Sequence, residues 1–163
     1  MFRFSKKTDY ALIALKDLAA LAAGVSVSAR DIASRYDIPA ELMAKVLQRL
    51  AKMGLVTSHH GTRGGYHLAR SAKEISVADV LQAIDGPVSV TACSDEDETC
   101  EQYDKCNVRD PLWLLKDRIV QSLSSFTVDE LVANSQDVSE TLPVTVTRRP
   151  VDAELVLPAT IVR

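Results

Sequence analysis

The periodicity of the apolar residues changes at Gly54, and this change limits the fold more than any other feature of the chain. Before Gly54, three segments repeat apolar residues at the three- and four-residue spacing of amphipathic helices. After it, two short segments have the residue types of strands, with a glycine-rich stretch between them. The N-terminal half is therefore predicted to contain three short helices followed by a β-hairpin.

Local signals predict where the helices begin and end. The helices are expected at residues 8–23, 29–35 and 40–53. Gly24 is expected to end the first helix in a left-handed conformation, and Ser28 is expected to cap the second by accepting a backbone hydrogen bond. Residues 37–39 are expected to form a tight turn, because Pro39 suits the start of the third helix. The third helix is expected to bury Leu42, Met43, Val46, Leu50 and Met53.

The hairpin is predicted to have a basic tip. Its strands are expected at residues 55–58 and 66–69. The connection 59–65 contains two histidines, one arginine and three glycines. A further helix should open at Ser76, which forms a capping-box sequence with Asp79, and should end at residues 85–87.

The C-terminal half is predicted to combine a cysteine-containing loop with one long helix. Residues 88–110 hold all three cysteines and show no period, so we expect a loop there. Asp110 and Pro111 favour the start of a helix, with Asp110 as its cap. Apolar residues then recur at intervals of three and four, as in a helix seam: Leu112, Leu115, Ile119, Leu123 and Phe126.

The composition excludes several classes of protein. Apolar residues make up 47% of the chain and charged residues 25%, which excludes disordered, collagen-like and disulfide-rich scaffolds. The apolar run that starts at Ala11 is broken by Lys16 and Asp17, so neither a signal peptide nor a membrane span is expected. Three cysteines are an odd number that no disulfide framework fits, so we expect a cytoplasmic protein with reduced thiols.

The charge of the chain is divided between two unlike halves. Residues 1–75 carry a net charge of +6 and residues 76–163 carry −9, which together give −3. A helix fits the major groove of DNA, and a hairpin tip can reach the adjacent backbone or minor groove. Three helices and a hairpin in a basic half therefore indicate a double-stranded DNA operator as the partner. A solvated helix face and an ordinary turn are the alternative for any one of these features.

Within this half, the third helix is expected to read the bases. Glu41, Lys45 and Gln48 share one solvent face at i, i+4 and i+7, where they can reach base edges. Basic residues are better suited to phosphates, which position a protein without specifying sequence. The remaining DNA-binding residues are predicted to be Ser28, Arg30, Arg49, Lys52, His60 and Arg63.

The cysteines are candidates for metal ligands. Cys93, Cys100 and Cys106 follow the pattern C-x6-C-x5-C in an acidic segment. Structural zinc sites more often contain paired C-x2-C motifs, so zinc is the weaker metal assignment. Three thiolates on a loop can instead surround an iron–sulfur cluster, either 2Fe–2S or 4Fe–4S, although the chain lacks a fourth cysteine. Incidental free thiols and a disulfide sensor made of two of the three remain open alternatives.

Several motifs together resemble one family of bacterial transcription regulators. They are SKKTDYA at residues 5–11, the Ile38-Pro39 helix start, LAKMGLV at 50–56, GGYHLAR at 64–70 and the three cysteines before the long helix. On these motifs, residues 1–132 resemble the IscR/NsrR/RirA family, and regulators of cluster assembly of the SUF type are the most similar members. The resemblance implies a winged-helix homodimer in which an iron–sulfur cluster tunes DNA binding.

The chain departs from the family pattern near the expected ligands. One extra residue separates Cys93 from Cys100, so the loop must have a different geometry. Assembly repressors place a ligating histidine three residues after the last cysteine, where this chain has Arg109, which cannot ligate. Members that sense nitric oxide use a first-helix aspartate of the partner chain, and the similar residue Asp9 is the predicted fourth ligand. The alternatives are a surface salt bridge for Asp9, and ligation by Asp104, Asp110, His59 or His60.

The predicted function is that of a homodimeric DNA-binding transcriptional regulator. It is expected to sense cluster, redox, iron or nitric-oxide status and to control iron–sulfur cluster assembly genes. A cluster-free repressor with a thiol/disulfide switch is the alternative. Catalysis is not expected, because all three histidines lie within residues 59–67 and no nucleophile motif surrounds a cysteine. Neither a membrane nor a small-molecule substrate is expected as a partner.

These expectations divide the chain into four regions. Residues 1–86 are predicted to form a winged helix-turn-helix DNA-binding domain, and residues 87–110 a cluster-binding loop. Residues 111–134 are predicted to form a dimerisation helix, with Leu112, Leu115, Ile119 and Leu123 at the contact between two copies. Residues 135–163 are expected to form a flexible tail. The predicted fold class is mainly α-helical with a small β-hairpin.

Overall fold

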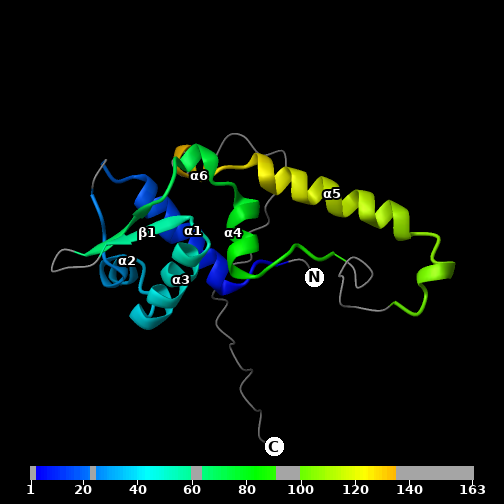
Figure 1. Ribbon diagram of the computed structural model, residues 1–163, viewed down its shortest axis with the longest axis horizontal. Helices are drawn as coiled ribbons and strands as arrows, with labels where there is room; N and C mark the ends of the chain where they lie inside the picture. Colours follow the sequence, from blue (N-terminus) through cyan, green and yellow to red (C-terminus); the bar gives the residue numbers. More distant parts are fainter. Residues whose placement is uncertain (1–2, 23–24, 60–63, 91–99, 135–163) are drawn as a thin grey trace, which may run out of the picture.

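The computed structural model describes residues 3–22, 25–59, 64–90 and 100–134. Within these ranges the chain forms helices and one antiparallel two-stranded sheet (Figure 1). The elements are α1 (Lys6–Ala19), α2 (Ala29–Arg35), α3 (Ala40–Lys52), β1 (Val56–His59), β2 (Gly65–Leu68), the 3-10 turn η1 (Ala72–Glu74), α4 (Val77–Ile84), the 3-10 turn η3 (Tyr103–Lys105), α5 (Arg109–Ser125) and α6 (Val128–Ala133). The predicted fold class, a winged helix-turn-helix with a long C-terminal helix, is confirmed. The boundaries of the four regions stay a prediction.

Side-chain caps define the starts of two helices as predicted. The Ser28 hydroxyl oxygen accepts a hydrogen bond from the Asp31 amide at 3.2 Å and so caps α2. The Ser76 hydroxyl accepts from the Asp79 amide at 3.1 Å, and the Asp79 carboxylate accepts from the Ser76 amide at 3.0 Å. This reciprocal pair is a capping box, which satisfies two donors that the first turn of α4 leaves open.

Two predicted helix ends are wrong. The first helix runs from Lys6 to Ala19 rather than over residues 8–23, and its last turn tightens where the Leu21 amide bonds to the Leu18 carbonyl at 3.3 Å; Gly24 lies outside the described residues. Asp110 does not cap α5, because the helix begins at Arg109 and Val108 is its cap residue. Asp110 instead lies in the first turn, where a carboxylate favours the helix N-terminus.

Left-handed residues close α2 and α3. Gly54 follows α3 with φ +73°, and the Leu55 amide donates to the Leu50 carbonyl at 3.0 Å, so the predicted stop at Gly54 is confirmed. Asp37 takes the same position after α2 with φ +51°, and the Ile38 amide donates to the Ala33 carbonyl at 2.9 Å. The turn between α2 and α3 therefore uses an aspartate where a glycine is the commoner residue.

The wing consists of β1 and β2, and its root is tied to the body of the molecule. The strands pair with Val56 opposite Leu68 and His59 opposite Gly65, one residue away from the predicted limits. Val27 extends the sheet, because its amide and carbonyl both hydrogen-bond to Tyr66. Gly65 must lie close to this segment, since a Cβ there would be 2.8 Å from the Val27 carbonyl carbon and oxygen.

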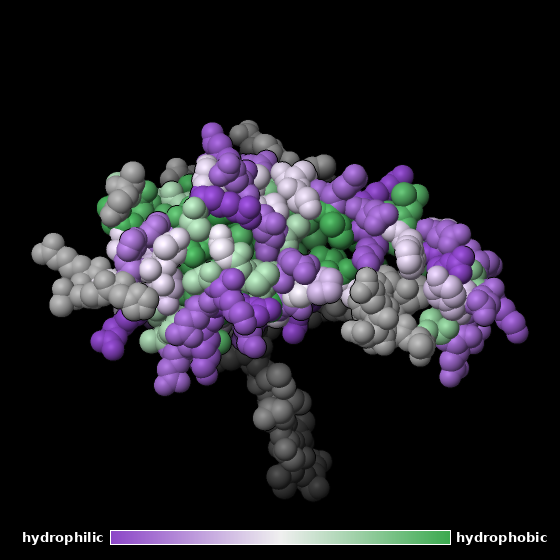
Figure 2. All heavy atoms as spheres, viewed as in Figure 1, coloured by the Kyte–Doolittle hydropathy of each residue, from purple (hydrophilic) through white to green (hydrophobic). Residues whose placement is uncertain are grey.

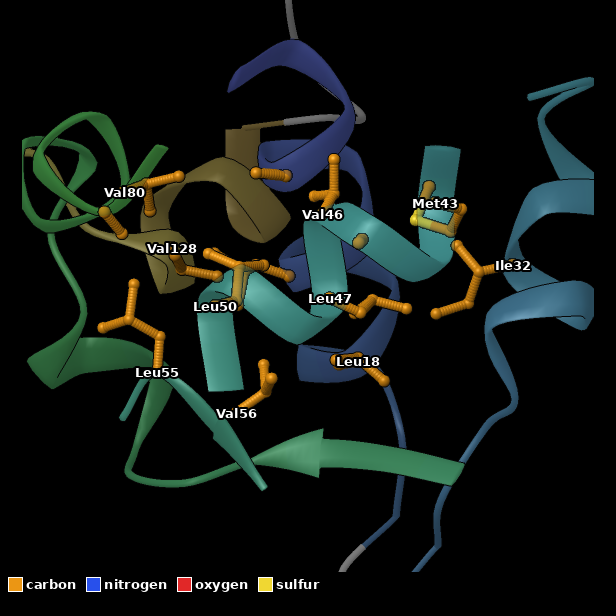
Figure 3. Close-up of a cluster of buried hydrophobic side chains, with 14 of the residues drawn as sticks. Leu18, Ile32, Met43, Val46, Leu47, Leu50, Leu55, Val56, Val80 and Val128 are labelled. Atoms are coloured by element: carbon orange, nitrogen blue, oxygen red, sulfur yellow. The ribbon is translucent and has the colours of Figure 1, made fainter. Parts of the chain in front are cut away.

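The hydrophobic core lies between α1, α2, α3, the wing, α4 and α6 (Figure 3). Its largest fully buried apolar side chains are Leu15, Ile32, Met43, Leu47, Leu50, Ile75, Val80 and Val128. Met53 is 44% exposed, contrary to prediction, because α3 ends at Lys52 and Met53 has left its buried face. Leu42 is only half-buried, whereas Leu47, which was not predicted, is completely buried.

The molecule has two parts of different shape. The recognition body, as we call it, comprises α1 to α4, the wing and α6. The α5 arm, residues 100–125, extends from this body on the side away from the wing (Figure 1). Among the described residues, α5 contributes none that is buried. None of the described helices is long and apolar enough to cross a membrane.

Candidate nucleic-acid interface

The two faces of α3 differ sharply in exposure. Met43, Leu47 and Leu50 are completely buried in the core. On the other side, all three predicted base-reading residues are exposed, together with two neighbouring cations: Glu41, Lys45, Gln48, Arg49 and Lys52. The space-filling view shows hydrophilic surface over this helix (Figure 2). A helix held by one face and polar on the other can be inserted into a major groove without losing its core contacts.

Helix α2, which packs against α3, is also held by contacts with α1. Arg35 Nη1 lies 2.7 Å from Asp17 Oδ2, and the Tyr36 hydroxyl donates to Asp17 Oδ1 at 3.1 Å. Burial and the negative charge of Asp17 raise the pKa of Tyr36, so this hydroxyl stays protonated as a donor. The angle between α1 and α2 therefore rests on one carboxylate with two partners.

The predicted α2 residues differ in how free they are to bind DNA. The Ser28 hydroxyl donates to Asp31 Oδ2 at 2.7 Å while it accepts from the Asp31 amide, so both roles of the hydroxyl are used in the cap. Arg30 is exposed at the start of the same helix. The structure thus explains the presence of Ser28 by helix capping, and its DNA contact stays a prediction.

An open groove of about 430 Å³ separates α2 and α3 from the wing. Ser28 and Gln48 line it from the helices, and Ser58, His59 and Tyr66 line it from the wing. His59 also stacks on His67, with ring centroids 4.7 Å apart. The sequence predicts His59 in the basic tip of the hairpin and, as an alternative, among the metal ligands; its pairing with Gly65 in the two-stranded sheet places it at this groove. His60 and Arg63 lie outside the described residues.

Arg49 has an internal partner that the sequence did not reveal. Its Nε donates to the Ala83 carbonyl of α4 at 2.7 Å. The two residues are 34 positions apart, so no local pattern could predict the bond. Part of the Arg49 guanidinium is therefore used within the protein, although the residue is exposed and was predicted to contact phosphate.

The start of α1 is tied to the end of α4 by one carboxylate. Asp85 Oδ1 accepts from the Ser5 hydroxyl at 2.7 Å, and Asp85 Oδ2 accepts from the Thr8 hydroxyl at 2.8 Å. Burial opposes the ionisation of Asp85, but these hydrogen bonds and the charge of Lys7 outweigh burial and lower the pKa of Asp85. Asp9, the next residue of α1, is exposed.

The predicted metal ligands are only partly within the described residues. Cys100 and Cys106 are free thiols, both half-buried, on either side of η3; Cys93 lies outside the described residues. Asp9 is exposed on α1, and Asp104 and Asp110 are also exposed. Within the described parts of the chain, no three Cys, His, Asp or Glu residues come together as a site for a metal ion.

Arg109 shapes the turn that contains Cys106. Its guanidinium lies 4.6 Å from the centre of the Tyr103 ring, and its Nη1 donates to the Tyr103 carbonyl at 3.3 Å. Its Nε donates to Asp110 Oδ1 at 2.9 Å, and this hydrogen bond is the main reason that the pKa of Arg109 is raised. Arg109 therefore acts as a permanent cation beside the cysteine, where assembly repressors of the resembled family have a histidine.

The predicted dimerisation residues lie along the α5 arm. Leu115 is 46% exposed, while Leu112, Ile119 and Leu123 are half-buried. Two further apolar residues, Trp113 at 46% and Leu114 at 55%, are exposed but were not predicted, because they fall outside the regular seam. Figure 2 shows apolar surface beside hydrophilic surface in this part of the molecule. A long helix with this much exposed apolar area is typical of an interaction site.

Comparison with known proteins places this architecture among bacterial regulators. Residues 4–134 match the Rrf2 family, which is described as "Iron-dependent Transcriptional regulator". The HTH-type transcriptional regulator IscR of Pectobacterium carotovorum is 38% identical over 135 residues, which cover 82% of this chain and 81% of that protein.

Solved structures have the same fold. The structure of IscR from T. potens superposes with a TM-score of 0.64 at 25% identity and covers 86% of this chain and 93% of that chain. CymR, the global cysteine regulator of B. subtilis, superposes with a TM-score of 0.65 at 26% identity and covers 83% of this chain and 99% of that chain.

Proposed function

The chain belongs to the Rrf2 family of iron-dependent transcriptional regulators, and we propose that it works as a homodimer whose DNA affinity responds to an iron–sulfur cluster. As a family member it is a DNA-binding regulator of transcription and not an enzyme. The proposed target genes are those of iron–sulfur cluster assembly, as the motif resemblance implies. One observation supports the DNA-binding part of this function: α3 exposes a polar face while its other face is anchored in the core.

The proposed DNA contacts divide by chemistry. Glu41, Lys45 and Gln48 are proposed to contact base edges in the major groove, because they project from the exposed face of α3. Arg30 and Lys52 are proposed to contact phosphates, which supply affinity and salt dependence. The wing is proposed to follow the adjacent backbone with His60 and Arg63. The groove lined by Gln48 and His59 lies between these two proposed contact surfaces.

The proposed dimer forms along α5. Leu112, Leu115, Ile119 and Leu123 recur on this helix, and Trp113 and Leu114 add exposed apolar area. The two symmetry-related recognition helices of a dimer must be about 34 Å apart to enter successive major grooves. The α5 contact would therefore set the spacing of the two α3 helices, and a small movement at this contact would change the fit to DNA.

The donors of the cysteine segment fit a thiolate-ligated cluster in their chemistry. Cys100 and Cys106 are free and half-buried on either side of η3. Cys93, Cys100 and Cys106 are the proposed thiolate ligands, with Asp9 of a second copy as the fourth. When bound, the cluster would supply iron that responds to redox state and nitric oxide. Arg109 would add a fixed positive charge beside this anionic group.

Anaerobic purification tests the proposal. We expect iron, acid-labile sulfide and visible absorption in the wild-type protein, and a native mass of two chains plus two clusters. Each of Cys93→Ala, Cys100→Ala and Cys106→Ala should lose both the iron and the response of operator binding. Asp9→Ala should weaken retention of the cluster, whereas Asp104→Ala, a matched exposed carboxylate, should not. Wild-type protein without iron and sulfide would contradict the cluster proposal.

The second candidate function is a thiol-switched repressor without a cluster. The observation in its favour is the pair of free, half-buried thiols Cys100 and Cys106, which flank one short turn. Such a repressor would contain no iron or sulfide, and its DNA affinity would change when a mild oxidant forms an intramolecular disulfide. Mass spectrometry after alkylation distinguishes the two functions, because only the switch loses two reactive thiols reversibly.

A further inference from the structure

The C-terminal turn of α4, residues 83–85, holds parts of the molecule that are far apart in the sequence. The Ala83 carbonyl accepts from Arg49 Nε of α3 at 2.7 Å. The Asp85 carboxylate accepts from the Ser5 and Thr8 hydroxyls at the start of α1, at 2.7 and 2.8 Å. We call residues 83–85 the α4 joint. The recognition helix and the N-terminal end of the chain are thus fastened to the same turn.

The bond from Arg49 has a clear cause in the local sequence. The last carbonyls of a helix have no intrahelical amide partner, and α4 ends at Ile84, one residue after Ala83, before the chain turns left-handed at Gly86. The carbonyl therefore needs another donor. A guanidinium supplies one, and its positive charge also suits the negative end of the helix dipole. Arg49 therefore supplies a donor to a carbonyl that the end of α4 leaves open.

We infer that Arg49 is a positioning residue, which fixes the angle of α3 against α4 through the α4 joint, rather than mainly a phosphate contact. The inference deepens the proposed function and rests on it. Asp85 connects the same joint to Thr8 of α1, which directly precedes the proposed ligand Asp9. Pro87, two residues after Asp85, begins the segment that leads to the cysteines. A displacement at either place reaches α3 through Arg49.

The surroundings of the joint agree with this role. Lys7 of α1, Lys45 and Arg49 of α3 and Ile84 of α4 line a single cleft of about 280 Å³. Helix α4 packs against both α3 and α5, so it connects the helix of the proposed DNA contact with the helix of the proposed dimer contact. In a dimer, a change in the tilt of α3 alters the separation of the two recognition helices.

The test uses DNA duplexes that the full-length wild-type protein selects from a random library, remade with the half-site spacing shortened or lengthened by one base pair. Wild-type protein should bind the selected spacing at least tenfold more tightly than the altered ones. Arg49→Ala and Arg49→Lys should each reduce this preference to below about threefold. Lys52→Ala, which removes an exposed cation from the same helix, should keep the preference.

Salt dependence distinguishes positioning from phosphate contact. Removing one phosphate contact from each protomer lowers the slope of log K against log salt by about two units in a dimer. Arg49→Ala should change the slope by less than about half a unit, because its role is not phosphate neutralisation. Arg49→Lys keeps the charge and loses the Nε donor, so it should resemble Arg49→Ala in spacing preference.

A second variant keeps the inference falsifiable if Arg49 variants fold poorly. Asp85→Asn weakens the link to α1 without altering any charge on α3, and it should also flatten the spacing preference without a change in slope. The inference would be overturned if Arg49→Lys kept the wild-type spacing preference and Arg49→Ala lowered the slope of log K against log salt by about two units. Failure of wild-type protein to select any DNA would instead count against the proposed function.

Discussion

The recognition body and the α5 arm are built on opposite principles. The body surrounds side chains such as Leu47 and Val80 completely, and the Asp85 carboxylate joins α1 to α4, which are far apart in the chain. The arm has no buried residue in its described helix, and its apolar side chains Trp113, Leu114 and Leu115 are about half exposed. The body therefore has the contacts to hold its own shape, whereas the apolar side chains of the arm are left open to solvent.

The strongest test of this contrast compares two leucines. Leu47→Ala should lower the free energy of unfolding of the body by about 2–5 kcal/mol, because it leaves a cavity in a closed core. Leu115→Ala should cost less than about 1 kcal/mol at protein concentrations where the chain is monomeric, since half of that side chain already contacts water. Urea unfolding followed by circular dichroism measures both. Equal losses for the two variants would remove the distinction between body and arm.

The close packing of the recognition body should extend to Gly65 at the root of the wing. Gly65→Ala should lower stability by about 2–3 kcal/mol, because the new Cβ would overlap the backbone of Val27 and push the segment before α2 away from β2. Gly54→Ala is the matched control, since it has open space around it and should cost about 1 kcal/mol for its left-handed φ alone. Thermal unfolding measures the pair. A smaller loss of stability for Gly65→Ala than for Gly54→Ala would show that the root of the wing accommodates the added Cβ.

The exposed face of the arm should control association and not folding. Leu114→Glu should raise the dimer dissociation constant at least tenfold, about 1.4 kcal/mol, because a charge would enter an apolar contact. Gln121→Glu adds the same charge to α5 at an exposed polar position and should leave association unchanged. Analytical ultracentrifugation measures the dissociation constant. Wild-type association in Leu114→Glu would exclude this face from the dimer.

The smallest expected effect concerns pH and the link between α1 and α4. Because the folded-state pKa of Asp85 is lowered, the ionised carboxylate stabilises the fold above its ordinary pKa of 3.8, and this contribution disappears as the pH falls through the lowered value. Asp85 is largely exposed, so the contribution should be below about 1 kcal/mol. In Asp85→Asn, the stability difference from wild type should be present at pH 7 and vanish in strong acid. A constant difference across that range would assign the loss to packing.

Features encoded by neighbouring residues were predictable from the sequence. The Ser28 and Ser76 caps and the stop at Gly54 each depend on residues three or four positions away, and all three are confirmed. The exposed face of α3 was predictable for the same reason, since helical periodicity assigns Glu41 and Lys45 to one side. Local rules failed at Asp110. This residue has the chemistry of a helix cap but lies inside the first turn of α5, because the helix begins one residue earlier at Arg109.

The contacts that assemble the candidate site could not be predicted in this way. Arg49 and Ala83 are 34 residues apart, and Thr8 and Asp85 are 77 residues apart. The stacking of His59 on His67 depends on strand register, and the closeness of Gly65 to Val27 depends on packing between the wing and the segment before α2. Each of these contacts requires the finished fold. The sequence supplied the candidate residues, and only the structure shows which of them have internal partners.

The end of α4 has a consequence for engineering. Residues 83–87 lie at the junction where a designer would replace the cysteine segment with another sensing module. A chimera that joins its new module before Gly86 either removes the Asp85 carboxylate or places a side chain at a φ of +93°, and each change disturbs the turn that holds Arg49. Retaining the chain through Gly86 should therefore matter more for a working fusion than matching the length of the original linker.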